Sequence, residues 1–324
     1  FKYPELTVDD HASQIIGTLE DKQLAHLLTT AMDGEEHGDV QVYIGGESRR
    51  AAYLCGLKKD AEYHGGVGFG ARFIQGLQQD DIDFYYCSVV AENAEARQML
   101  EKSRRLLSMQ PISGYRTYIL NPKIRINAPH HSFTFRQATE HDIEPLLTFL
   151  NAEGRKKDMF PVIRSLDDDY HLKAEDFYLL LDGTNILAVA ALWKQTAYKQ
   201  YVVKRYGTLM KLARLCNPLL SAMRYIRLPK ENEPLDFPML AFFLCREDNT
   251  AYFRIFLHEI THEIAKSYRM FVIGLPDCHA AKPMMDRLPS IRFKTEIYGI
   301  SFPWSGQVYQ TPDPNRLFLE CGLL

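Results

Sequence analysis

Short apolar runs alternate with longer amphipathic stretches along the chain, and this order predicts a mixed α/β protein. The short runs are rich in aromatic and β-branched side chains, as is typical of strands. They lie at 51–57, 82–90, 115–120, 177–181, 186–193, 239–245, 271–275 and 293–302. The amphipathic stretches have helical periodicity and lie at 92–107, 143–153 and 250–267. The predicted fold class is therefore α+β, in which mixed sheets are flanked by helices.

A glycine-rich segment follows the strand predicted at 51–57, and a helical sequence, ARFIQGLQQ, begins at Ala71. Its glycines are Gly65, Gly66, Gly68 and Gly70. This density suits a loop that turns with positive φ or approaches a ligand closely. The free N–H groups of the next helix would favour an anion, above all a phosphate. A tight turn without a ligand fits as well, because neither GxxxxGK[ST] nor GxGxxG is present.

The run from Gly56 to Gly70 resembles the acetyl-CoA loop of the Gcn5-related N-acetyltransferases. That family reads strand, G-L-[RK]-V-x-P-x-[YF]-R-G-x-G-[IV]-G, helix, and this chain reads G-L-K-K-D-A-E-Y-H-G-G-V-G-F-G. Lys59 and Ala61 stand where Val and Pro are usual. The usual Arg is His64 or Gly65, depending on where the one extra residue of this loop is placed. The resemblance implies acetyl-CoA as co-substrate.

The resemblance also implies which residues contact the coenzyme. The end of the strand would pair with the pantetheine arm, and the amides of the loop would hold the diphosphate. The implied cofactor-binding residues are Leu57, Lys58, Lys59, His64, Gly65, Gly66, Val67, Gly68, Phe69, Gly70 and Ala71. Farther along, N-x-x-A-x-x-x-L after a strand is similar to the family's second coenzyme-contacting segment, which adds Asn93. Asn93 equally fits an ordinary helix N-cap.

The reaction implied by the resemblance is direct transfer of the acetyl group to an amine. A backbone N–H would stabilise the oxyanion, and a base would take the proton of the amine. The family often uses a Tyr after the Asn93 turn, where this chain has Leu100 and Glu101, so the catalytic residues stay unassigned. Tyr85, Tyr86 and Ser88 are candidates by position, although aromatic strand residues usually lie in a core. A non-catalytic acyl-CoA-binding or interaction module is the alternative.

The second half of the chain repeats the order of the first. R-x-A-T-x-x-D-I at 136–143 resembles the opening of an acetyltransferase domain, and Thr139 to Asp142 has the form of a capping box. Arg246 to Thr250 replaces the glycine loop with a turn that carries two carboxylates, which would repel a diphosphate. We therefore expect two tandem acetyltransferase-like folds, the second a degenerate scaffold or part of the acceptor pocket. The expected division is a coenzyme-binding domain at 1–121 that lacks the family's first strand and helix, a linker at 122–132, and a second domain at 133–324.

Composition limits the class of protein. A chain of 324 residues with 46% hydrophobic content can bury about two domain cores. The net charge of −3 argues against a nucleic-acid partner, and no apolar run is long enough to span a bilayer. Six scattered cysteines without a CxxC pair fit a reducing cytoplasm. The expected partner is a small-molecule or peptide amine acceptor, and a homodimer is left open.

His258 to His262 reads HEITH and matches the HExxH motif of zinc metallopeptidases. On a helix, both imidazoles would share a face and could bind zinc, with Glu259 as general base. No GxxH continues the motif, and no glutamate-bearing helix downstream supplies a third ligand. A solvated helix face that carries His258, Glu259, His262 and Glu263 is the favoured interpretation, and no metal is expected.

The stretch from Lys194 to Lys230 contains many basic residues among Leu, Met and Tyr, and no acidic residue. It fits an amphipathic helix that lies on a membrane surface or on a protein partner. It also fits a solvated face that covers the seam between the two domains. Pro218 interrupts the helical pattern and favours the second interpretation.

Overall fold

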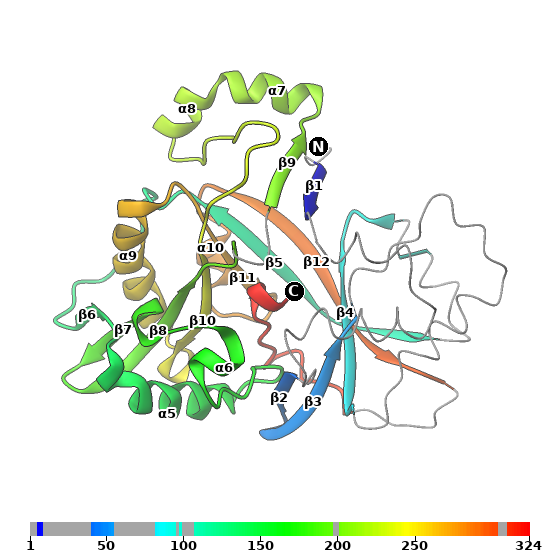
Figure 1. The fold of residues 1–324 in the computed structure, drawn as a ribbon, viewed down its shortest axis with the longest axis vertical. Helices are drawn as coiled ribbons and strands as arrows, with labels where there is room; N and C mark the ends of the chain where they lie inside the picture. The colour runs from blue at the N-terminus through cyan, green and yellow to red at the C-terminus, as the bar shows by residue number, and fades with distance from the viewer. Residues whose placement is uncertain are drawn as a thin grey trace.

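The computed structural model of this 324-residue chain describes residues 5–8, 40–54, 82–94, 97–98, 107–196, 201–303 and 310–324. One large mixed sheet runs through the described part of the chain, with helices on both of its faces (Figure 1). The prediction of a mixed α/β fold is confirmed.

The large sheet has ten strands in the order β2-β3-β4-β12-β5-β11-β10-β8-β7-β6. Its strands are β2 (Val40–Ile44), β3 (Glu47–Tyr53), β4 (Phe84–Val90), β5 (Ser108–Leu120), β6 (Thr134–Gln137), β7 (Phe177–Asp182), β8 (Asn185–Trp193), β10 (Met239–Cys245), β11 (Phe271–Pro276) and β12 (Ser290–Ser301). A separate two-stranded sheet joins β1 (Glu5–Val8) to β9 (Tyr201–Arg205).

The helices are mostly short. The α-helices are α5 (Ile143–Gly154), α6 (Leu166–Tyr170), α7 (Thr208–Leu215), α8 (Asn217–Ala222), α9 (Thr250–Ser267) and α10 (Lys282–Met285). The 3₁₀ turns are η2 (Glu140–Asp142), η3 (Ala174–Asp176), η4 (Arg246–Asp248) and η5 (Cys321–Leu323).

The two halves of the chain exchange strands at the middle of the sheet. β12, from the second half, lies between β4 and β5 of the first half and pairs antiparallel with both. β5 in turn pairs antiparallel with β11 of the second half. On either side of this centre lies one parallel pair, β3 with β4 and β10 with β11. The sheet hydrogen bonds therefore link the halves into one continuous structure.

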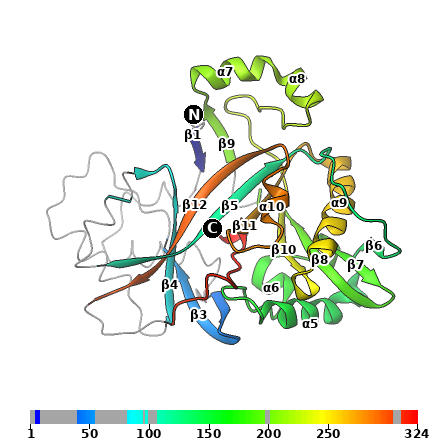
Figure 2. The same cartoon turned by 180° about the vertical axis from the view of Figure 1, so that it is seen from behind.

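α5 and α9 cover opposite faces of the second half of this sheet. Adjacent residues of a strand point to opposite faces, and β10 shows this clearly. Leu240 packs in the cluster that contains Phe256 and Ile260 of α9, whereas Ala241 packs in the cluster that contains Leu146 of α5. Figure 2 shows the same helices from behind.

The capping box predicted from Thr139 to Asp142 is present at the turn that leads into α5. The backbone N–H and the hydroxyl of Thr139 both donate to Oδ2 of Asp142, each at 2.8 Å. Arg136 also donates to both oxygens of that carboxylate, at 2.8 and 2.7 Å. The Thr139 hydroxyl is thus turned toward the carboxylate, and the first turn is the 3₁₀ turn η2 that leads into α5.

The segment 121–133 between the halves crosses the core. Ile124 and Ile126 are only 7% and 8% exposed and pack in the same cluster as α9. Burial of two isoleucines fixes this segment against the second half of the sheet, because their apolar surface is removed from water. The predicted linker is therefore a packed connection.

β9, α7 and α8 form an excursion that lies beyond one end of the main sheet (Figure 1). Val203, Tyr206 and Leu228 make a small core of their own, against which Met210, Ala213 and Leu220 pack. The excursion meets the body through Ile291 of β12, which packs on that small core.

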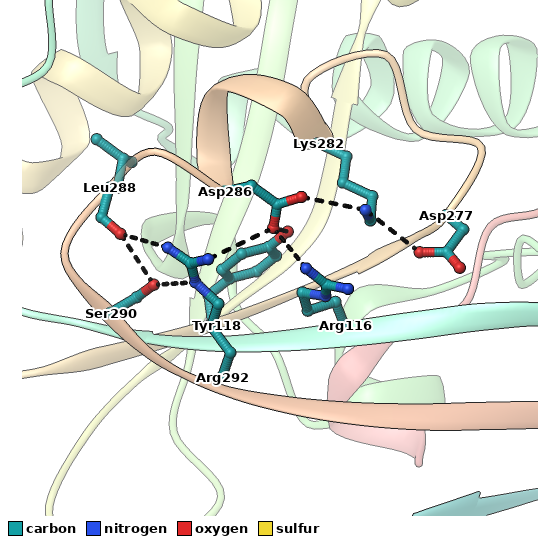
Figure 3. A network of polar contacts seen from close by, with 8 residues as sticks. All are labelled: Arg116, Tyr118, Asp277, Lys282, Asp286, Leu288, Ser290 and Arg292. Carbon is teal, nitrogen blue, oxygen red and sulfur yellow. Dashed lines mark hydrogen bonds and ion pairs between the residues drawn. The ribbon is translucent and has the colours of Figure 1, made fainter. Parts of the chain in front are cut away.

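A polar network joins the central strands to the turn that carries α10 (Figure 3). Asp286 Oδ1 accepts from Arg116 Nη1 at 2.9 Å and from the Tyr118 hydroxyl at 2.8 Å. Asp286 Oδ2 lies 3.1 Å from Lys282 Nζ, and Arg292 Nη1 lies 4.0 Å from Oδ1. Burial alone would raise the pKa of Asp286, but the hydrogen bonds from the Tyr118 hydroxyl, Lys282 and Arg116 outweigh it and hold that pKa below its ordinary value. The carboxylate therefore ties β5 and β12 to α10.

Candidate active site

The parallel strands β3 and β4 pair over only a short stretch. Ala51, Ala52 and Tyr53 are opposite Phe84, Tyr85 and Tyr86, and the N–H of Leu54 donates to the Tyr86 carbonyl at 2.7 Å. β4 continues to Val90, and β12 pairs with its other edge as far as Val90. Within the described residues, no strand extends β3 beside 87–90. Backbone groups on this edge of β4 are therefore in position to pair with an extended ligand or with chain from 55–81.

Two hydroxyl groups lie where β3 ends. The Tyr53 hydroxyl and Ser88 Oγ are hydrogen-bonded across the end of the strand pair. Both side chains are half-buried, and the Tyr53 ring lies 5.0 Å from the Tyr86 ring. A neutral hydroxyl pair of this kind can donate and accept hydrogen bonds, and a tyrosine that gives up its proton becomes a phenolate.

The other candidates from the sequence differ in their surroundings. Tyr85 is fully buried and packs edge-on against Phe302 at 5.0 Å, so its ring belongs to a core. Tyr86 is 4% exposed and packs within the cluster of Phe84 and Tyr115. Of the three sequence candidates, Ser88 alone is half-buried and has its hydroxyl at the end of the parallel pair.

Asn93 directly follows the turn at 91–92 that comes after β4. Its carbonyl accepts from the N–H of Arg97 at 3.3 Å, as the carbonyl of an N-cap residue does in the first helical turn. Its own N–H donates to the Val90 carbonyl at 2.9 Å, and the residue is exposed. The other predicted coenzyme contacts, Leu57 to Lys59 and His64 to Ala71, lie outside the described residues.

The second parallel pair, β10 and β11, parts even earlier than the first. Met239 and Val272 are its one strand-register pair, supported by the bond from the Val272 N–H to the Pro238 carbonyl at 3.1 Å. A bulge in β10 then places Phe242 at a φ of 51°, a left-handed conformation that is unusual for a bulky residue. The bulge frees the Phe242 N–H from the ladder with β8.

The last residues of the described chain fill the place where β10 and β11 part. Oε2 of Glu320 accepts from the Phe242 N–H at 2.6 Å, and Oε1 accepts from the Gly322 N–H at 3.2 Å. The Tyr115 hydroxyl donates to the Leu319 carbonyl at 3.0 Å. Glu320 is only 4% exposed, and this burial raises the pKa of its carboxyl to about 7. Sequence reasoning missed Glu320, although an acid inside the apolar run LFLECGLL is a readable signal.

The turn after β10 carries the acidic residues noted in the sequence. Glu247 and Asp248 both have positive φ, at 54° and 53°, inside the 3₁₀ turn η4. Asp248 forms an ion pair with Lys157. Oδ1 of Asn249 accepts from the Ala251 N–H at 2.9 Å, so the side chain of this residue already caps the start of α9. An anion would have to displace that cap and approach two carboxylates.

The HExxH segment lies on α9, where the two imidazole rings face each other at 4.8 Å. The prediction that His258 and His262 share a helix face is confirmed. Nδ1 of His262 lies 2.9 Å from the His258 carbonyl oxygen, and Glu259 Oε1 lies 3.5 Å from His131 Nε2. Within the described chain, His258, Glu259 and His262 are the one group of three ligand-type side chains, with ligand atoms within 4.8 Å. His262 is exposed, whereas His258 and Glu259 are half-buried.

No family model matches the sequence, and no curated protein matches it significantly. Solved structures do match. A Saccharomyces cerevisiae N-myristoyltransferase with bound myristoyl-CoA aligns with a TM-score of 0.51 at 7% identity, over 87% of this chain and 68% of that chain.

Two GCN5-related N-acetyltransferases also align, each with a TM-score of 0.44. The protein from Kribbella flavida is 11% identical, over 92% of this chain and 71% of its own. The protein from Anabaena variabilis is 8% identical, over 82% of this chain, and the match spans only 58% of its own length.

At such identities the likeness to these proteins, including the yeast enzyme, concerns the fold alone. The chain has the mixed α/β fold seen in N-myristoyltransferase, which is an acetyltransferase-like fold. The predicted resemblance is confirmed at that level. Among the described residues, no helix combines the length and the apolar character needed to cross a bilayer.

Proposed function

We propose that this protein is an acyl-CoA-dependent N-acyltransferase that binds its coenzyme in the first half of the chain. The observation that carries the proposal is the early end of the β3–β4 pair, because no described strand pairs with the backbone of 87–90 on that edge. A pantetheine arm can add to such an edge as a strand would, through backbone hydrogen bonds. The fold shared with an enzyme whose structure holds myristoyl-CoA supports the same function.

The coenzyme contacts in this proposal are those implied by the sequence. Leu57, Lys58 and Lys59 continue from β3 and would pair with the pantetheine arm. The amides of 64–71 would hold the diphosphate at the start of the following helix. Asn93, at the first turn after β4, would approach the same arm from the neighbouring strand.

The chemistry proposed is attack of an acceptor amine on the thioester carbonyl. The new C–N bond forms, the C–S bond breaks, and the coenzyme leaves as a thiolate. The amine proton passes to a base, and a proton donor neutralises the thiolate. We propose that the Tyr53–Ser88 hydroxyl pair lies next to the thioester and supplies that proton. Positioning of the two reactants would provide most of the rate enhancement.

The second half would not bind coenzyme. Glu320 takes the Phe242 N–H at the place where β10 and β11 part, and the turn beyond β10 carries Glu247 and Asp248. We propose that this half is a scaffold and contributes to the acceptor pocket, and that acceptors are small amines or peptide N-termini. Acetyl is the acyl group that the loop motif favours, and a longer acyl group is the alternative to test.

The test measures thiol release by the full chain from acetyl-CoA and from myristoyl-CoA, with a panel of amines and peptides. Gly68→Asp places a carboxylate in the proposed diphosphate loop, as the second half has naturally. Its matched control is Gly207→Asp, because an added Cβ at Gly207 meets nothing within 4 Å. We expect coenzyme affinity to fall at least about tenfold for Gly68→Asp alone.

Three results decide the proposal. Thiol release that needs an amine and persists with a chelator supports transfer without a metal. Coenzyme binding without thiol release, for every amine, favours a non-catalytic acyl-CoA-binding module. Absence of binding to both coenzymes, or equal loss in the two glycine variants, would overturn the assignment.

A further inference from the structure

Exposed apolar side chains gather on the excursion formed by α7 and α8. In the described chain, six large hydrophobic residues are exposed, and four of them lie between 212 and 223. These four are Leu212 (61% exposed), Leu215 (78%), Leu219 (60%) and Met223 (57%). They are spaced by three and four residues across two consecutive helices: Leu212 and Leu215 lie on α7, Leu219 lies on α8, and Met223 directly follows α8. They form what we call the outer row.

The outer row has no role in packing the excursion itself. The opposite side of α7 and α8 supplies Met210, Ala213 and Leu220 to the small core of Val203, Tyr206 and Leu228. A surface helix normally needs only one such apolar side. The outer row therefore leaves a second apolar side in contact with solvent, at the part of the described chain that lies beyond the end of the main sheet (Figure 1).

The charge around the outer row is positive. Between Thr208 and Lys230 there is no acidic residue. The basic residues in that range are Lys211, Arg214, Arg224, Arg227 and Lys230. Acidic residues follow at Glu231, Glu233 and Asp236, and Glu231 Oε1 lies 3.5 Å from Lys211 Nζ. Lys211, Arg227 and Lys230 are exposed, and of these Lys211 already lies opposite the Glu231 carboxylate.

We infer that α7 and α8 dock on an anionic membrane surface. The outer row would enter the boundary between headgroups and acyl chains, while the basic side chains stay among the anionic headgroups. A second copy of this chain fits poorly, because a two-fold contact would place the same positive charges opposite each other. Charge complementarity thus selects an anionic partner, and the shallow apolar row on short helices fits a lipid surface. This attachment needs no spanning helix and is independent of the reaction proposed above.

The experiment is flotation of the full chain with two kinds of vesicle. One kind is phosphatidylcholine alone, and the other contains about one third phosphatidylserine. We expect binding to the anionic vesicles and its weakening with added salt, because the charge contribution is screened.

Paired variants separate the apolar contribution from the charge contribution. Leu215→Gln and Leu219→Gln are expected to weaken binding about tenfold each. Arg227→Gln and Lys230→Gln should weaken binding to anionic vesicles about fivefold each. The matched control is Ile143→Gln, an equally simple change at an exposed residue of α5, which should leave binding unchanged. Unchanged thermal unfolding of the variants shows that folding is intact, as expected for exposed side chains.

Failure of the wild-type chain to float with anionic vesicles at low salt would overturn the inference. Equal effects of the leucine variants and Ile143→Gln would overturn it as well. If Leu215→Gln abolishes a dimer in sedimentation and vesicles bind neither protein, the outer row is a contact between copies. Binding only to an acidic protein, with no vesicle binding, would identify a protein partner.

Discussion

Glu320 offers the sharpest test of how the C-terminal segment packs where β10 and β11 part. Its carboxyl is fully buried, and burial raises its pKa from 4.5 to about 7 despite bonds from the N–H groups of Phe242 and Gly322. The folded chain therefore holds a proton there over a pH range in which the unfolded chain has released it. Glu320→Gln replaces the acid with a neutral group of the same size, which resembles the protonated carboxyl.

The magnitude follows from linkage between protonation and folding. Because the folded pKa is raised, the favourable contribution is complete below pH 4.5 and is lost as the pH rises through about 7. Each unit of pKa difference corresponds to about 1.4 kcal/mol, so the wild-type chain loses about 3 kcal/mol across this range relative to the variant. Above about pH 8 the difference stays constant.

The assay is urea unfolding of the wild-type chain and of Glu320→Gln at a series of pH values between about 4.5 and 8. Only the difference between the two free energies of unfolding is used, because other groups titrate in the same range. His279, whose pKa burial lowers to about 4, changes stability in the opposite direction and cancels in this difference. Glu231→Gln is the control, since the Tyr206 N–H and Lys211 lower the pKa of Glu231. Its contribution to stability is lost only below pH 4.5, so its difference from wild type should stay flat across this series.

A difference between wild type and Glu320→Gln that does not change with pH would refute the reasoning. It would mean that Glu320 titrates in the folded chain as it does in the unfolded one. The C-terminal segment would then not be packed where β10 and β11 part, and the argument that this place is occupied would be lost.

Three further predictions concern the centre of the sheet. Asp286→Asn should lower the free energy of unfolding by about 2 kcal/mol, because the charged hydrogen bonds from Arg116 and Lys282 are weakened. Asp182→Asn, at an exposed residue, is the control in the same urea titration. Gly274→Ala should destabilise the chain by about 3 kcal/mol, since the new Cβ would lie 1.9 Å from the Tyr115 hydroxyl, whereas Gly207→Ala should change stability by less than about 0.5 kcal/mol. We expect residues 1–132 and 133–324, expressed separately, to lack cooperative thermal unfolding and to regain it when mixed. The reason is that β5 and β12 each lie between strands of the other half. Two halves that fold separately would contradict this prediction.

The elements that could be predicted from the sequence are those whose signal is local. The hairpin predicted at 177–181 and 186–193 is observed as β7 and β8, and the helix predicted at 250–267 is α9 with the same bounds. The spacing of apolar residues in these elements matches the spacing of the residues that are buried, and Asn249 caps the start of α9. Local period and capping therefore sufficed in the second half.

The strand predicted at 51–57 shows where a local signal misleads. The observed strand, β3, begins at Glu47 and ends at Tyr53. Its first residues are exposed or half-buried and include Arg49 and Arg50. The apolar pattern in the sequence therefore begins after the true start of the strand. The register is set instead by the two-residue turn at Gly45 and Gly46, both with positive φ, which joins β2 to β3.

The strand exchange had no signal in the sequence at all. β12 pairs with β4 and β5, which are distant in the chain, and pairing of that kind leaves no periodic mark. The positive φ of Phe242 could not be predicted from the sequence either, because the position holds neither glycine nor asparagine, the residues that usually adopt it. Of the predicted coenzyme contacts, the described residues include only Asn93, so the glycine loop stays a prediction.

Two independent features of the second half oppose a coenzyme, and they act at different places. The acidic turn at Glu247 and Asp248 would repel a diphosphate beyond the end of β10. Glu320 instead accepts a hydrogen bond from the Phe242 N–H between the parting strands. An acyl carbonyl bound there would need that donor. Removing the two negative charges of the turn would therefore not be enough to create a second coenzyme site. The Phe242 N–H would still be bonded to Glu320. If the first half binds the coenzyme as proposed, the groups where the two parallel pairs part decide which half is available for chemistry.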